Sequence, residues 1–135
     1  IFLDHITIAV SEGADGKTGN EAVDYVMSQL LKVVKKHNVW LGVISHLRKG
    51  TERKPFEEGY LPTVDDIKGS GSIKQISFDI IAFARHMTHE DAVVRNTINF
   101  RVLKARKTGR TGDAGSAFYD HETTRLRKTD MMEFA

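Results

Sequence analysis

Two polar residues each follow an apolar segment that predicts a buried strand. Asp4 follows Ile1-Phe2-Leu3 within the predicted strand 1–10, and His46 follows the predicted strand 39–45. Open α/β sheets bind their ligands at the carboxyl ends of such strands. A carboxylate there can hold Mg²⁺, and a histidine can reach a terminal phosphate and report its presence to the following loop. The alternatives are a carboxylate satisfied by neighbouring amides and an ordinary surface histidine.

Lys104 and Arg106 lie at the end of another predicted strand, residues 97–104, where alternation places both on one side. Two fixed cations suit the charge of a phosphoryl-transfer transition state, and an arginine can act in the site of a neighbouring subunit. The surrounding segment contains five basic residues and no acidic one: Arg101, Lys104, Arg106, Lys107 and Arg110. This density suits a polyanion, although cations also protect exposed strand edges.

A third candidate segment, residues 65–75, combines flexible glycines, amide donors and two lysines, Lys68 and Lys74. Loops of this composition hold nucleic-acid phosphates, although the pattern alone is only moderately specific.

Residues 11–18 end in Gly-Lys-Thr and nearly match a phosphate-binding loop. However, Ser11 replaces the glycine that permits the tight turn, and Asp15 would place a carboxylate among the donors. We therefore expect no phosphate site here.

Composition narrows the class of protein. The chain has 135 residues, 40% hydrophobic and 28% charged, which excludes a disordered or low-complexity protein and predicts one domain. It has no cysteine, and the remaining histidines show no metal-binding spacing. No apolar run approaches the length of about 18 residues that spans a bilayer, so we expect a soluble protein without a membrane partner. The lack of cysteine permits a cytoplasmic location.

The pattern of apolar residues predicts an α/β fold. Residues 21–36 form an amphipathic helix that Thr18 or Asn20 can cap, with a possible capping box between Thr18 and Glu21. Because the helix connects two strands, those strands should be parallel. The further elements expected are a long loop at 47–65, a helical turn at 70–75, strands at 78–83 and 97–104, and a terminal hairpin of 117–119 with 125–127.

Four segments in this order resemble the second half of the RecA-like motor of hexameric replicative DNA helicases. They are Leu3-Asp4-His5, Ile44-Ser45-His46-Leu47, residues 66–75 and residues 103–109. The chain is most similar to the primase-helicases of tailed bacteriophages, and the bacterial DnaB-type helicases are more distant. The resemblance covers residues 1–127, and residues 128–135 form a C-terminal tail.

The resemblance implies a role for each matching residue. Asp4 corresponds to the aspartate that supports Mg²⁺, His46 to the γ-phosphate sensor, and Lys104 and Arg106 to the cations that enter the next subunit's ATP site, with Arg106 as the finger. Arg85 and Tyr119 correspond to the residues that sandwich the nucleotide base. The implied DNA-binding residues are Arg48, Lys54, Lys68, Gly69, Gly71 and Lys74.

Some features of the family pattern are changed or missing. Glu52 stands where the phage proteins have a basic residue, and Lys68 replaces an arginine and so loses its bidentate fork. No genuine phosphate-binding loop, catalytic glutamate or linker helix is found, and the chain begins at Ile1 rather than at Met. We therefore expect an N-terminally truncated fragment that is inactive alone.

The sequence thus predicts a RecA-like, mostly parallel sheet flanked by helices, with a C-terminal β-hairpin. The full-length protein would be a homohexameric DNA helicase that uses ATP, or another NTP or dNTP, with Mg²⁺ to move along single-stranded DNA. Primase and a replicative polymerase are further expected partners, and the location is the host cytoplasm if the protein is viral. The alternatives are a RecA-type recombinase and a non-catalytic remnant that binds single-stranded DNA.

Overall fold

The computed structural model describes residues 1–13, 15–53, 55–69 and 71–128. These residues form two compact units. The first contains Ile1–Arg48 and Asp66–Ser77, and the second contains Lys49–Asp65 and the chain from Phe78 onward. The predicted tail, residues 128–135, lies outside the described residues except for Lys128.

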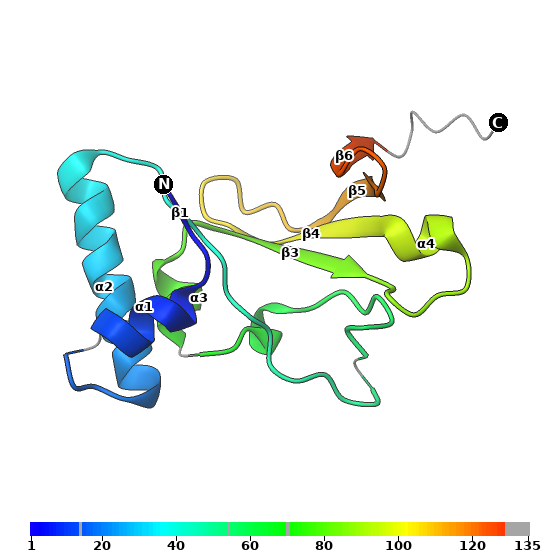
Figure 1. Cartoon of the computed structure of the whole chain (residues 1–135). Helices are drawn as coiled ribbons and strands as arrows, with labels where there is room; N and C mark the ends of the chain where they lie inside the picture. The colour runs from blue at the N-terminus through cyan, green and yellow to red at the C-terminus, as the bar shows by residue number, and fades with distance from the viewer. Residues whose placement is uncertain (14, 54, 70, 129–135) are drawn as a thin grey trace. The chain divides into compact units, whose positions relative to one another are not determined.

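The first unit contains a short parallel sheet and three helices (Figure 1). Strand β1 (Phe2–Leu3) pairs in parallel with β2 (Gly42–Val43), as the sequence predicts. The helices are α1 (Ile6–Gly13), α2 (Gly19–His37) and α3 (Gly71–Ile76), and the 3₁₀ helix η1 (Val64–Asp66) precedes α3 at the boundary of the units.

The prediction of one strand over residues 1–10 is wrong, because the strand ends at Leu3 and α1 begins at Ile6. The Ile6 amide donates to the Ile44 carbonyl at 3.0 Å, and Ile6 itself is buried. Half-buried Ala9 and Val10 follow at helical spacing, while Thr7 and Ile8 are exposed. A short apolar run can form either a strand or a helix. Here the buried and half-buried positions follow the spacing of a helix.

The predicted helix at 21–36 is confirmed as α2, which packs its buried Ala22, Val26 and Met27 within the first unit. Thr18 is the N-cap, as expected, but its side chain makes no capping hydrogen bond, so the expected capping box is absent. The basic residues of the last turn face the negative end of the helix dipole. Thus α2 is held by its apolar face and not by its cap.

The second unit contains a four-stranded antiparallel sheet in the order β3-β4-β5-β6. Its elements are β3 (Asp79–Arg85), α4 (Ala92–Asn96), β4 (Thr97–Ala105), β5 (Gly112–Asp120) and β6 (Arg125–Lys128). The strands expected at 78–83 and 97–104 and the terminal hairpin are confirmed.

The α/β class is also confirmed, but parallel pairing is confined, among the described strands, to β1 and β2. Between β3 and β4 the only helix is α4, which has five residues. This connection is too short for a crossover that would make β3 and β4 parallel, so β4 returns antiparallel beside β3. No helix in the described part of the chain is long and apolar enough to cross a membrane.

The turn between β5 and β6 is built around Asp120. Its carboxylate accepts hydrogen bonds from the Glu122 amide at 2.9 Å and the Thr123 amide at 3.3 Å, and it pairs with Arg127 across the hairpin. A hydrogen bond from the Thr123 side chain, opposed by desolvation and supported by the two amides and Arg127, holds the pKa of Asp120 below its ordinary value. Asp120 therefore organises the turn that follows Tyr119.

We predict that acidification loosens this turn. Because folding lowers the pKa of Asp120, its contribution is fully present above the ordinary carboxyl pKa and is lost as the pH falls through the lowered value. The measurement is the pH dependence of the Glu122 and Thr123 amide signals in NMR spectra. Asp120→Asn keeps an acceptor oxygen but cannot titrate, so it should lack the acid transition. The same transition in that variant would contradict the prediction.

Candidate functional site

Asp4 and His46 both emerge at the carboxyl end of the parallel pair, as predicted. Asp4 directly follows β1, and the segment after β2 continues the pairing because the Ile44 amide donates to the Leu3 carbonyl at 2.9 Å. Both Asp4 and His46 are exposed. Asp4 offers a single accessible carboxylate, which suits Mg²⁺, a cation that retains several waters and commonly takes one or two protein carboxylates together with phosphates. The donor chemistry at this edge therefore fits the ion that the resemblance implies.

His5 was not assigned a role from the sequence, but it contacts His46. The centroids of the two imidazole rings lie 4.3 Å apart, with an angle of 67° between their planes. The Nδ1 atom of His5 is buried and has no hydrogen-bond partner among the described residues. In the sequence, the only indication of a role for His5 was its position next to Asp4 at the end of a strand.

The backbone of His46 is connected directly to the glycine-rich segment. The Lys68 amide donates to the His46 carbonyl at 2.9 Å, and the Arg48 amide donates to the Asp66 carbonyl at 2.8 Å. Leu47 and Ile67 pair as an antiparallel bridge between these bonds, and Ile67 is buried. We call residues 46–48 and 66–68 the ladder. It joins the predicted sensor to two predicted DNA-binding residues, Arg48 and Lys68.

The remaining predicted DNA-binding residues of this segment follow the ladder. Gly69 has φ +118, and a Cβ there would lie 3.1 Å from the Cδ1 atom of Ile73. A side chain at Gly69 would therefore strain the backbone and crowd the adjacent helix. Gly71 begins α3, and Lys74 lies within it. Lys54 lies outside the described residues.

Lys104 and Arg106 lie together at the end of β4 in the second unit. Lys104 pairs with Ile80, and one residue beyond the strand the Arg106 amide donates to the Phe78 carbonyl at 2.9 Å. The Arg106 guanidinium lies 4.7 Å from the centroid of the Phe78 ring. Desolvation, followed by the charge of Arg106, lowers the pKa of Lys104. Two cations at one strand end are suited to a negatively charged ligand.

Arg85 and Tyr119 lie on one face of the antiparallel sheet. Arg85 pairs with Ile98, Ile98 pairs with Ala117, and Tyr119 is two residues further along β5. Because directly paired residues share a face, Arg85 and Tyr119 stand on the same side, about 10 Å apart across two strand spacings and offset by two residues along the strand. This spacing leaves room for a flat ring between a guanidinium and a phenol.

A shallow pocket adjoins Arg85, and its walls include residues that sequence reasoning missed. It is lined by Phe56, Phe83, Ala84, Arg85, Met87 and Ile98. Phe56 comes from the long loop, which is held there because the Met87 amide donates to the Glu57 carbonyl at 2.8 Å. In the sequence, only its aromatic side chain distinguished Phe56, because the surrounding loop has no periodic pattern of apolar residues.

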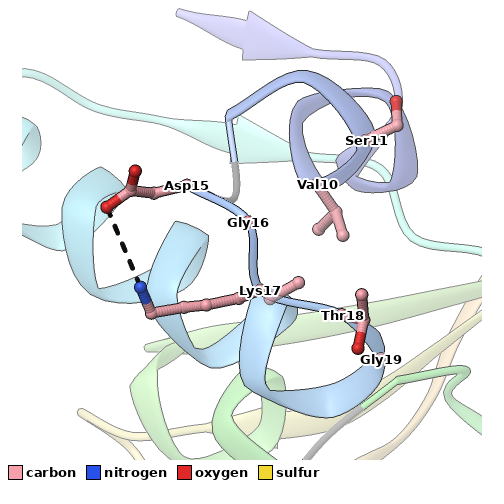
Figure 2. A pocket seen from close by; sticks show the side chains of 8 residues that line it. Val10, Ser11, Asp15, Gly16, Lys17, Thr18 and Gly19 are labelled. Atoms are coloured by element: carbon pink, nitrogen blue, oxygen red, sulfur yellow. Dashed lines mark ion pairs between the residues drawn. The ribbon is translucent and has the colours of Figure 1, made fainter.

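The Gly-Lys-Thr segment also lines a pocket (Figure 2). Lys17 is directed to the Asp15 carboxylate at 4.0 Å, and its ammonium lies 4.5 Å from the centroid of the Tyr25 ring. This contact places the Asp15 carboxylate beside the lysine that the phosphate-binding pattern would direct to a phosphate. Among the described residues, no cluster of three or more His, Asp or Glu side chains could hold a metal.

Comparison with known proteins adds sequence and fold relationships. No family model matches the chain. It is 37% identical over 123 residues to a DNA helicase/primase of Enterobacteria phage T3, covering 91% of this chain. The chain spans 21% of the length of that relative.

Two solved structures share the fold. One is an ATPase domain, which matches with a TM-score of 0.67 at 17% identity, over 86% of this chain and 39% of that one. The other is a DnaB-like replicative helicase, described with its interactions with primase, which matches with a TM-score of 0.69 at 17% identity, over 84% of this chain and 26% of that one. The chain therefore belongs to the family of the phage DNA helicase/primases, and it has a RecA-like fold that it shares with part of each of these two structures.

Proposed function

We propose that this chain is part of the motor of an ATP-dependent replicative DNA helicase and that it couples the state of the bound nucleotide to the grip on single-stranded DNA. The observation that carries the proposal is the ladder. It joins the segment of His46, at the end of the parallel strands, to the segment of Lys68, at the start of the glycine-rich loop, by two backbone hydrogen bonds.

On the nucleotide side, Asp4 holds Mg²⁺ through its exposed carboxylate. When bound, the ion supplies positive charge to the phosphate oxygens. His46 contacts the γ-phosphate from the adjacent strand. Because the ladder is short and its central Ile67 is buried, a shift of the His46 backbone is passed to Lys68 instead of being absorbed by a flexible linker.

Lys104 and Arg106 act on the nucleotide of a neighbouring subunit in a homohexameric ring. Lys104 lies at the end of β4 and Arg106 one residue beyond it, so both cations stand at the same strand end. Two cations at one place suit the charge on a transferred phosphoryl group during in-line attack by water. Arg85 and Tyr119 hold the base between them, and their position on one face of the sheet supports this role.

On the DNA side, Arg48, Lys68 and Lys74, with Lys54 in the intervening loop, provide charge to the phosphates of one strand. Gly69 and Gly71 permit a close approach of the backbone, whose amides are further donors. Cations and amides read no base edges, so binding should be independent of sequence and sensitive to salt. Primase and a replicative polymerase complete the proposed set of partners.

One prediction of this function tests the proposed arginine finger, Arg106, in the full-length protein. Arg106→Ala should reduce DNA-stimulated ATP turnover on the order of 10³-fold while nucleotide binding is largely kept, because the guanidinium acts on charge that develops in the transition state. Steady-state hydrolysis and nucleotide titration measure the two effects. Lys107→Ala, which removes the next cation along the chain, is the matched control and should change turnover little.

Mixed rings test whether Arg106 acts between subunits. Rings assembled from Asp4→Ala and Arg106→Ala subunits contain interfaces at which an intact Asp4 meets an intact Arg106. These interfaces should restore part of the activity. Mixtures that remain as inactive as either variant alone would contradict action in trans.

Another prediction tests the coupling between the bound nucleotide and DNA affinity. His46→Ala should bring DNA affinity with a triphosphate analogue close to that with diphosphate, because the sensor no longer distinguishes them. Lys68→Ala should instead weaken DNA binding in every nucleotide state and reduce the salt slope by about one unit. The measurement is single-stranded DNA affinity with each nucleotide at several salt concentrations. If His46→Ala only lowers stability and keeps the triphosphate preference, the sensor assignment is wrong.

A further inference from the structure

The backbones that carry His5 and His46 are fixed relative to each other. The Ile44 amide donates to the Leu3 carbonyl at 2.9 Å, and the Ile6 amide donates to the Ile44 carbonyl at 3.0 Å. These bonds bracket His5 on both sides, and Ile6 beyond it is buried. Relative motion of the two histidines is therefore left mainly to their side chains.

His5 is half-buried, whereas His46 is exposed. The buried Nδ1 atom of His5, without a partner among the described residues, shows that this edge of the ring is covered by protein. His46 meets this fixed ring edge-to-face at a centroid separation of 4.3 Å. Aromatic rings in this arrangement attract each other and restrict each other's rotation.

We propose that His5 is the positioning residue of the γ-phosphate sensor. This inference rests on the proposed function, in which His46 contacts the terminal phosphate. An exposed histidine must give up rotational freedom to make such a contact, and that loss weakens binding. The His5 ring restricts His46 before the nucleotide arrives, so that less freedom is lost when the contact forms.

The same contact connects the sensor to the metal side of the site. His5 directly follows Asp4, the proposed Mg²⁺ ligand, and its ring touches the residue that starts the ladder. The His5 ring therefore holds the His46 side chain in a fixed position relative to the end of β1, where Asp4 lies. His5 itself touches neither phosphate nor metal in this proposal.

The experiment compares single-stranded DNA affinity with a triphosphate analogue and with diphosphate in the full-length protein. The variants are His5→Ala, His5→Phe, His46→Ala and the double variant His5→Ala with His46→Ala. His5→Ala should reduce the ratio of the two affinities about three- to tenfold, the scale of one immobilised side chain. His5→Phe keeps an aromatic ring and removes the unpaired nitrogen, so it should keep the ratio with no loss of thermal stability.

The double variant should show the same ratio as His46→Ala alone, because His5 acts only through His46. Ile6→Val serves as the control for stability. This substitution removes one methyl group from the buried residue next to His5. It should lower the melting temperature and leave the ratio of the two DNA affinities unchanged.

The outcomes separate this inference from the proposed function. If His46→Ala loses the triphosphate preference but His5→Ala keeps it, the positioning role is wrong and the sensor assignment stands. Effects of His5→Ala and His46→Ala that multiply in the double variant would also overturn the positioning role. If His46→Ala keeps the preference, the sensor assignment fails, and the role of His5 fails with it.

Discussion

Two backbone hydrogen bonds, from Lys68 to His46 and from Arg48 to Asp66, are the constraint on which this account depends. They close a loop of the chain that leaves the first unit at Arg48 and returns at Asp66. Without them, the residue at the end of the parallel strands and the glycine-rich segment would be joined only by 21 intervening residues, 47–67. Ile67 at the centre of the ladder is buried, so its side chain anchors this short connection in the first unit.

The second unit positions its candidate residues by a different device, the register of an antiparallel sheet. Pairing of β3, β4 and β5 places Arg85 and Tyr119 on one face, and the end of β4 brings Lys104 beside Arg106. The turn at Asp120 fixes the end of β5 next to Tyr119. The backbone hydrogen bonds of the sheet therefore fix the positions of these residues, and contacts between their side chains are hardly needed for this.

The sequence predicted the elements whose signals are local or periodic. The apolar stripe of α2 and the alternation in β4 were sufficient to predict these two elements. The parallel pair was predicted too, but with strands that are too long, because β1 ends at Leu3 and β2 at Val43 instead of at residues 10 and 45. The helix at Ile6–Gly13 was missed because an apolar run of ten residues fits both periods until its buried face is known. The ladder, the ring contact of His5 and the place of Phe56 were missed because each joins segments far apart in the sequence. The proposed roles of the site residues came from the resemblance and remain predictions.

The most direct test of the central claim is the hydrogen exchange of the ladder amides in the full-length protein. The Lys68 and Arg48 amides are the donors of its two bonds, and their protection reports how often the ladder opens. If the nucleotide is read at His46 and passed along the backbone, a triphosphate analogue should slow exchange at both amides relative to diphosphate, and His46→Ala should remove the difference. Equal exchange at Lys68 and Arg48 with the two nucleotides in the wild-type protein would contradict the account.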